Sequence, residues 1–311
     1  MSNLGGAPRI AFIGAIDFSK HCLLEAINHQ GNIVSITGLD PRYASRHSDY
    51  ADLSHTAIDF NIPYQSINNI NSNSSIRNLK ELNPDYFFIF GWSQLLSTEV
   101  LSIPKIGSIG SHPALLPKNR GRHPLIWSLI NNEATGGLTF LYLDSGIDNG
   151  DILWQQSFPI TEWDDAGTLY ARIKTLASTG VPDLLNEMMS GPLIGTSQNE
   201  EIATYLRKRS EEDGIIHWTL PAKAIHSLVR ALTHPYVGAH SYYNGKKITI
   251  WKTKIQDTVD VQTPYPKLMP GFIFESAKDG FYVTTGSIPL QLLEYDIDDN
   301  DTLSHGSYME N

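Results

Sequence analysis

The first 90 residues alternate between short apolar runs and segments whose apolar side chains recur at helical spacing. Residues 9–14 form an apolar run that ends in glycine, and residues 18–29 follow with the helical pattern. Residues 32–38 are rich in β-branched side chains, as strands are. This order predicts a strand, a helix and a second strand, which is how an α/β domain begins.

The same alternation continues to the end of this region. Helices are predicted over residues 49–60 and 75–82, with a short strand at 62–64 between them. Residues 86–90 are aromatic or aliphatic without exception, which predicts a buried parallel strand that stops at Gly91.

The carboxyl ends of these strands are where a ligand is expected. Open α/β sheets bind ligands beyond those ends, which places Gly91 and Trp92 at the rim of a pocket. A cap on the core is an equally good interpretation of Trp92. Another strand is predicted over residues 139–143, and it would deliver the loop of residues 144–151 to the same edge.

The residue pattern of the chain changes near residue 205, where a second structural unit is predicted to begin. A charged linker is predicted over residues 207–214 and a short helix over 221–232. From residue 241 onward, glycine, proline and alternating runs such as residues 248–251 predict a small β-barrel.

A length of 311 residues suits two domains. We expect a Rossmann-like α/β catalytic domain over residues 1–204 and a small OB-like β-barrel domain over residues 205–311. The tail after Asp296 is acidic and is expected to fray.

The formal net charge of −10 and the pI near 5.5 argue against nucleic acid as the main partner, because phosphate contacts need clustered Lys and Arg. The apolar runs fall short of the roughly 20 residues of a membrane helix, and the first residues show no secretory signal. The sequence therefore predicts a cytoplasmic protein without a membrane span. The single cysteine, Cys22, is expected in the core of the first helix.

The strongest chemical signal is a histidine followed by a proline-stiffened turn. His112 lies within residues 111–121, next to Pro113 and shortly before Pro117, in a setting too polar for a routine core position. A carboxylate beside such an imidazole favours its charged form and can accept a proton, which suits general acid-base work on a carbonyl.

Three carboxylates are candidates for that partner. Asp144, Asp148 and Asp151 share one glycine-flanked loop, and their chemistry alone does not choose among them. Lys118 and Arg120 either contact an anionic ligand or lie on a solvated face. No metal site is expected, because the histidines lack the spacing of zinc ligands, and the first strand-to-helix loop lacks the spacing that binds a nicotinamide cofactor.

These motifs resemble the formyltransferases that use 10-formyltetrahydrofolate. The resemblance rests on residues 107–121 with Trp127, Thr139 and residues 148–150. Residues 212–218 and 229–239 are in turn similar to the barrel shared by methionyl-tRNA formyltransferases and sugar-nucleotide N-formyltransferases.

The resemblance implies roles for particular residues. It makes His112 and Asp148 catalytic, with 10-formyltetrahydrofolate as cosubstrate. Its pterin would be held around two loops, which comprise Phe90, Gly91, Trp92, Leu143, Asp144, Ser145 and Gly146. Contacts to the second substrate are expected from Lys118, Arg120 and His123.

One position departs from the family's pattern. The family's active site is an Asn-x-His unit plus Asp, and Gly110 stands where that asparagine is expected. Losing one donor to a developing oxyanion typically costs about 100- to 1,000-fold in rate. Ser111 is the nearest side chain that could replace it, although alternation along an extended segment would point it to the opposite face.

The resemblance further implies, as acceptor, the amine of a nucleotide-linked amino deoxysugar, as in O-antigen and lipopolysaccharide biosynthesis, and a homodimer. An aminoacylated tRNA is a less favoured acceptor, because binding its phosphates needs a basic C-terminal domain, and residues 211–311 carry 8 Lys and Arg against 13 Asp and Glu. Less favoured as well are a non-catalytic protein that binds folate or a nucleotide sugar, and an enzyme that hydrolyses 10-formyltetrahydrofolate.

Overall fold

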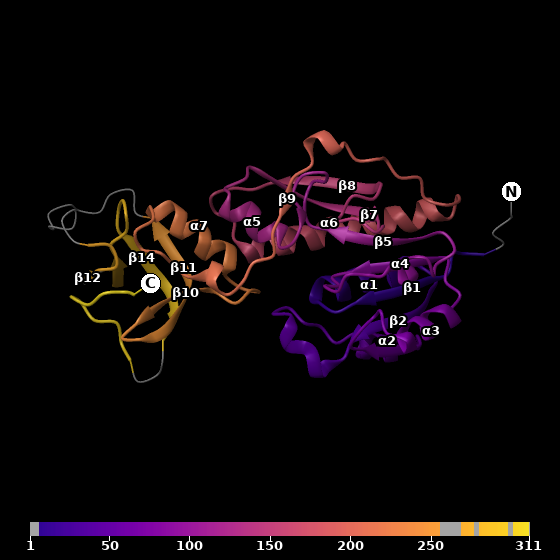
Figure 1. Cartoon of the computed structure of the whole chain (residues 1–311), viewed down its shortest axis with the longest axis horizontal. Coiled ribbons are helices and arrows are strands. Elements are labelled where there is room, and N and C mark those ends of the chain that lie inside the picture. The colour runs from indigo at the N-terminus through magenta and orange to yellow at the C-terminus, as the bar shows by residue number, and fades with distance from the viewer. Residues whose placement is uncertain (1–5, 256–268, 277–279, 298–300, 311) are drawn as a thin grey trace. The chain divides into compact units, whose positions relative to one another are not determined.

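The computed structural model describes residues 6–255, 269–276, 280–297 and 301–310 (Figure 1). The chain forms two compact units. The first consists of Met1–Pro124, Thr135–Pro159 and Tyr170–Leu206, and the second of Leu125–Ala134, Ile160–Leu169 and Arg207–Asn311. The second unit thus includes two short segments that lie before the expected domain boundary in the sequence.

The first unit is built on a seven-stranded sheet in the order β3-β2-β1-β4-β5-β7-β8. Its strands are β1 (Ile10–Gly14), β2 (Ile33–Leu39), β3 (Tyr64–Ile67), β4 (Tyr86–Phe90), β5 (Gly107–His112), β7 (Thr135–Tyr142) and β8 (Ile152–Pro159). The strands from β3 to β5 are parallel, whereas β7 and β8 are antiparallel to their neighbours. The predicted Rossmann-like α/β class is therefore confirmed.

Four helices lie where the sequence predicts them, with shifted ends, whereas those over Thr98–Leu101, Pro124–Ile130 and Ala166–Met188 were not predicted (Figure 1). They are α1 (Asp17–Asn28), α2 (Ser54–Asp59), α3 (Asn73–Glu81), α4 (Thr98–Leu101), α5 (Pro124–Ile130), α6 (Ala166–Met188) and α7 (Ala222–Leu232). The helix expected over 49–60 is shorter, because it begins only at Ser54, after a turn, a β-bridge between Tyr50 and Ile16, and three irregular residues.

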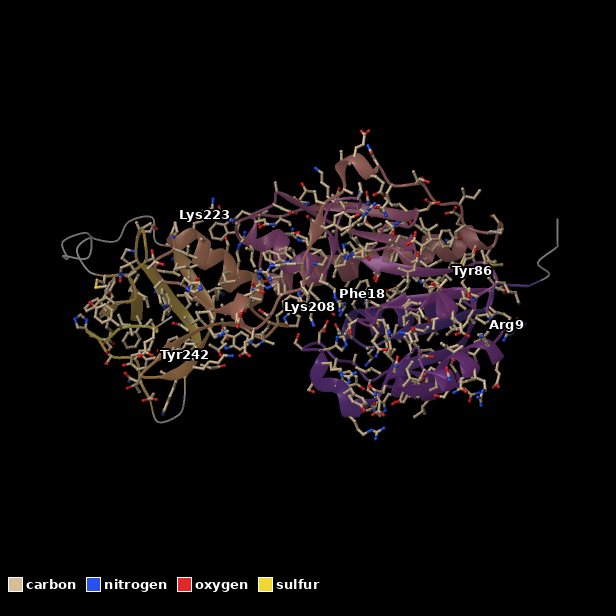
Figure 2. All side chains as sticks on the ribbon, viewed as in Figure 1. Arg9, Phe18, Tyr86, Lys208, Lys223 and Tyr242 are labelled. Atoms are coloured by element: carbon tan, nitrogen blue, oxygen red, sulfur yellow. The ribbon has the colours of Figure 1, made fainter. Side chains whose placement is uncertain are left out.

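Both faces of the sheet are covered, because alternate residues of β1 and β4 point to opposite sides. On one face, Phe12, Phe90 and Phe140 pack ring against ring, and α1 and α6 cover them. On the other face, Ile13 and Ile89 pack with Ile76, Leu79 and Val100 from α3 and α4. Side chains fill the space between the sheet and its helices (Figure 2).

A second, two-stranded sheet joins distant parts of the first unit. β6 (Arg120–Gly121) pairs in parallel with β9 (Tyr205–Leu206). The residues after the His112 turn are thereby tied to the segment that ends this unit.

The second unit contains α7 and a five-stranded antiparallel sheet in the order β10-β11-β14-β13-β12. Its strands are β10 (Ala239–Tyr243), β11 (Lys246–Ile255), β12 (Ile273–Ser276), β13 (Gly280–Val283) and β14 (Leu290–Asp296). The residues near the C-terminus pair with both edges, because Tyr242 bridges Glu310 and Phe272 bridges Tyr308. These bridges link the two edges as a barrel requires.

The prediction of a frayed tail after Asp296 was wrong for the described residues 301–310. Leu303 and Met309 are buried, at 5% exposure each. Apolar side chains thus anchor this acidic segment, together with the backbone bonds that Met309 and Glu310 make.

No helix among the described residues is long and apolar enough to cross a membrane.

Ser19 provides a test of how the carboxyl end of β4 is held. Its buried hydroxyl donates to the Phe90 carbonyl at 2.6 Å and accepts from the amides of Ala15 and Ile16. We expect Ser19→Ala to lower the free energy of unfolding by about 1–3 kcal/mol, because buried polar groups lose their partner. Urea denaturation measures this value. Ser74→Ala, which removes an exposed hydroxyl, is the control, and equal effects would contradict the expectation.

Candidate active site

His112 ends β5, and the turn that follows is fastened to the neighbouring strands. Thr139 lies opposite His112 in β7, and its hydroxyl donates to the Ala114 carbonyl at 2.6 Å. The side-chain amide of Gln155, opposite Thr139 in β8, donates to the Leu116 carbonyl at 3.0 Å. These bonds satisfy carbonyls of the buried turn and fix the backbone that follows His112.

Asp148 is the carboxylate that reaches His112. Its Oδ2 lies 3.5 Å from Nδ1 of His112 and accepts a hydrogen bond of 2.8 Å from the amide of Gly121. The histidine side chain is 5% exposed and that of Asp148 24% exposed, so the pair opens to solvent on the aspartate side. Asp148 has φ of +50°, a conformation that non-glycine residues adopt only when their surroundings hold them.

The two nitrogens of the His112 ring have different partners. Nε2 lies 2.7 Å from the backbone carbonyl of Asn119. A carbonyl can only accept, so Nε2 carries a hydrogen and Nδ1 faces the Asp148 carboxylate. Each nitrogen is thus oriented by a group of the first unit, which fixes the plane of the ring.

The other two carboxylates of the loop lie elsewhere. Asp144 is exposed, and its Oδ1 accepts from the Gly146 amide at 2.8 Å. Asp151 accepts from the hydroxyl of Ser197 at 2.9 Å. The geometry therefore separates Asp148 from its two neighbours, which sequence chemistry alone did not.

The route by which this loop reaches His112 differs from the expected one. Because β7 is antiparallel to β5, the loop leaves from Tyr142, which lies opposite Ile109. It does not start at the carboxyl end of β5, so it must run back along that strand to bring Asp148 to His112. Leu143 lies on this path.

Leu143 occupies the space beside Gly110. A Cβ added at Gly110 would lie 2.5 Å from Cδ2 and 2.9 Å from Cγ of Leu143. Leu143 also packs against the core cluster that contains Ile89. The position at which the family pattern expects an asparagine side chain is therefore filled by an apolar one.

Ser111 does not point toward this space. It pairs with Phe140, whereas Gly110 pairs with Leu141 and His112 with Thr139, so Ser111 lies on the opposite face of the sheet. This placement does not fit the expected use of Ser111 as a replacement donor.

The segment after β4 combines a tight backbone with an unpaired donor. Phe90 is buried, and its carbonyl accepts from Ser19. Gly91 has φ of +63°, and a Cβ there would lie 2.3 Å from Ile16. Trp92 packs on the core cluster, yet its Nε1 is buried without a hydrogen-bond partner. Both interpretations of Trp92 thus have support, because its ring caps the core while its nitrogen remains available to an acceptor.

The second predicted folate segment is more open. Asp144, Ser145 and Gly146 are exposed, and Leu143 is half-buried over Gly110. The turn is closed by the bond from the Gly146 amide to Asp144.

The three predicted substrate contacts differ in accessibility. Lys118 and His123 are exposed. Arg120 is fully buried, with its guanidinium bonded to Glu200, Gln198 and Tyr205, which does not fit a direct contact to substrate. The bonds to Glu200 raise the pKa of Arg120.

Sequence reasoning missed several groups around this pair. The Asn119 carbonyl and the Gly121 amide are backbone atoms, which no side-chain motif reveals. Arg122 donates to the Ser93 carbonyl at 2.9 Å, and Gln198 holds the Asp148 loop. Neither has a sequence spacing that marks it.

Among the described residues, no group of three or more His, Cys, Asp and Glu side chains could hold a metal ion.

Comparison with known proteins decides the family. The formyl transferase model matches residues 9–185, and the model of the formyl transferase C-terminal domain matches residues 208–311. The chain belongs to the formyl transferase family. It is 30% identical over 289 residues to the methionyl-tRNA formyltransferase of Caldanaerobacter subterraneus subsp. tengcongensis, covering 92% of this chain and 91% of that protein. This formyl transferase is thus an enzyme that transfers formyl groups, as the sequence predicted.

Two solved structures resemble this formyl transferase in fold. HypX from Aquifex aeolicus has a TM-score of 0.67 at 17% identity, covering 92% of this chain and 44% of HypX. The N-formyltransferase from Helicobacter canadensis, in complex with folinic acid and dTDP-3-aminofucose, has a TM-score of 0.65 at 19% identity, covering 91% of this chain and 98% of that one.

The packing of Leu143 over Gly110 can be tested by a double-mutant cycle. We expect Gly110→Ala to lower the free energy of unfolding by about 1–3 kcal/mol through overpacking. The same change should cost much less in a Leu143→Ala background, because the clashing atoms are gone. Urea denaturation of the four proteins measures the coupling.

The control is Gly6→Ala, where a Cβ would meet nothing within 4 Å and stability should not change. An equal cost of Gly110→Ala in both backgrounds would refute the contact.

Proposed function

We propose that this formyl transferase moves a formyl group from 10-formyltetrahydrofolate to the amine of a nucleotide-linked amino deoxysugar. The observation that carries the proposal is the His112–Asp148 pair within a formyl transferase fold, with Oδ2 and Nδ1 3.5 Å apart. Acid-base groups at this distance can move a proton during acyl transfer to an amine.

The residues of the first unit fit a folate. Trp92 Nε1 is a buried donor without a partner, and pterin rings carry acceptors. Gly91, with φ of +63°, lets the backbone turn tightly against Ile16 just before Trp92. We assign Phe90, Gly91 and Trp92 to one side of the folate site, and Leu143, Asp144, Ser145 and Gly146 to the other. Bound there, 10-formyltetrahydrofolate supplies the formyl group.

The roles of the site residues follow from their partners. Asp148 or a water held by it accepts the proton that the acceptor amine loses on forming its bond to the formyl carbon. The bond from that carbon to N10 of the folate breaks, and N10 takes up a proton as it leaves. His112, with Nε2 fixed by Asn119, keeps Nδ1 directed at that carboxylate. Lys118 and His123, which are exposed and lie close to His112 in the sequence, are assigned to the sugar or its phosphates.

The oxyanion site is rearranged relative to the family pattern. Gly110 offers no side-chain donor, and Leu143 fills the adjacent space. A backbone amide, an ordered water or a side chain from another loop therefore takes over the stabilisation of the negative charge on the formyl oxygen. Ser111 is not assigned this role, because it lies on the other face of the sheet.

The net charge of the C-terminal residues favours a small acceptor over a tRNA. Residues 211–311 carry 8 Lys and Arg against 13 Asp and Glu, a formal net charge of −5. A C-terminal domain that binds tRNA needs the opposite balance, because its contacts neutralise phosphates. The Helicobacter canadensis structure, with its dTDP-linked amino sugar, illustrates the acceptor class that we favour.

Methionyl-tRNA is the second candidate acceptor. The observation in its favour is the 30% identity to a methionyl-tRNA formyltransferase over most of both chains. A cytoplasmic location and a homodimer remain predictions.

The proposal is tested by mixing the protein and 10-formyltetrahydrofolate with dTDP-, UDP- and GDP-linked amino sugars and, separately, with charged initiator tRNA. We expect an N-formylated sugar nucleotide, identified by mass spectrometry, and no formylated tRNA. Formylation of tRNA alone would overturn the assignment of the acceptor. Folate binding without transfer to any acceptor would indicate a binding protein, and folate turnover without an acceptor would indicate a hydrolase.

Asp148→Asn tests the choice of carboxylate. We expect kcat to fall by about 100- to 10,000-fold, because the proton acceptor is lost, while folate affinity changes little. Asp151→Asn is the matched control, since it alters a carboxylate of the same loop that bonds Ser197 instead of His112. Equal losses in the two variants would contradict the role of Asp148.

A further inference from the structure

The backbone around Asp148 is held by one side-chain amide. Gln198 Nε2 donates to the carbonyl of Asp148 at 2.8 Å and to the carbonyl of Gly150 at 2.7 Å. Both hydrogens of the amide are thus used on the two sides of Asn149. A loop with φ of +50° at Asp148 needs such restraint, because that conformation is otherwise costly.

A buried guanidinium fixes the orientation of this amide. Gln198 Oε1 accepts from Arg120 Nε at 3.1 Å and from Nη2 at 2.9 Å. An amide rotated by half a turn would direct its hydrogens at the guanidinium and its oxygen at two carbonyls. Donor would then face donor and acceptor would face acceptor, so Arg120 leaves only one orientation open.

Arg120 is itself anchored at its outer edge. Its two terminal nitrogens contact the carboxylate of Glu200 at 2.6 and 2.8 Å, and Nη1 also meets the Tyr205 hydroxyl at 2.7 Å. Paired donation of this kind fixes the plane of a guanidinium. The Glu200 side chain is 64% exposed, so the chain of bonds runs from solvent inward to the Asp148 loop.

Three consecutive residues therefore control the catalytic pair. The Asn119 carbonyl sets the His112 ring, the Arg120 side chain acts through Gln198 on the backbone of Asp148, and the Gly121 amide binds its carboxylate. The pairing of β6 with β9 holds this short strand in place.

We infer that Gln198, oriented by Arg120, is a positioning residue that sets the distance and angle between the Asp148 carboxylate and His112. The expected effect of Gln198 on kcat rests on the proposed function. Its expected effect on the geometry of the His112–Asp148 pair does not depend on which acceptor the enzyme uses. Gln198 touches neither reacting group through its own side chain, so it acts only through the loop.

Gln198→Met tests this role, since it keeps the length of the side chain and removes every hydrogen bond. We expect kcat to fall by about 10- to 100-fold with little change in KM for the folate, because a small misplacement of a reacting group is costly. We also expect the ¹⁵N resonances of the His112 ring, assigned with His112→Asn, to shift in the variant without any substrate. The His112 resonances report the geometry of the His112–Asp148 pair even if no acceptor is formylated. Failure of this inference can therefore be told apart from failure of the proposed function.

Gln65→Met is the matched control. Gln65 is also half-buried, and its amide donates to Thr37 at 2.9 Å. It should leave both kcat and the His112 resonances unchanged. Equal changes in the two variants, or no change at His112 in Gln198→Met, would overturn the inference.

Gln198→Glu provides a second variant if Gln198→Met does not fold. A carboxylate retains the contact to Arg120 but places an oxygen against the carbonyls of Asp148 and Gly150. We expect it to shift the His112 resonances and lower kcat, and wild-type values for both would refute the role.

Discussion

The antiparallel pairing of β7 with β5 is the constraint on which the rest of the site depends. It places Thr139 opposite His112 and starts the following loop beside Ile109. A parallel strand would have released that loop at the carboxyl end of β5. Here the loop must return along β5, so Leu143 covers Gly110 before Asp148 reaches His112. The apolar contact and the His112–Asp148 pair are thus two consequences of one strand direction.

The His112–Asp148 pair is held in place mainly by hydrogen bonds from other groups of the first unit. His112 takes its orientation from a carbonyl, Asp148 from an amide and from Gln198, and Gln198 from a buried guanidinium. Burying Arg120 requires the partners that it has, because an unpaired charge inside a protein is strongly destabilising. The network therefore links the burial of Arg120 to the geometry of the His112–Asp148 pair.

Gly110 lacks a side-chain donor, and Leu143 in addition fills the space that such a donor would occupy. An empty space could have admitted a water to bind the formyl oxygen, but an apolar side chain occupies the position. The chemistry proposed for this chain must consequently stabilise negative charge from another direction. This physical difference separates the chain from the family pattern while the fold and the His112–Asp148 pair are kept.

The sequence by itself determined the α/β class and the alternation of strands and helices over the first 90 residues, because hydrophobic periodicity carries that information, and local motifs marked His112 as a candidate catalytic residue. It also favoured Asp148, although only through resemblance to a family. Tertiary structure decided what depends on distant parts of the chain, such as the direction of β7, the burial of Arg120 and the contact between Leu143 and Gly110. Residues 78 positions apart meet in the bond between Arg120 and Gln198. No local pattern encodes such a bond, since only the packed chain brings its two partners together.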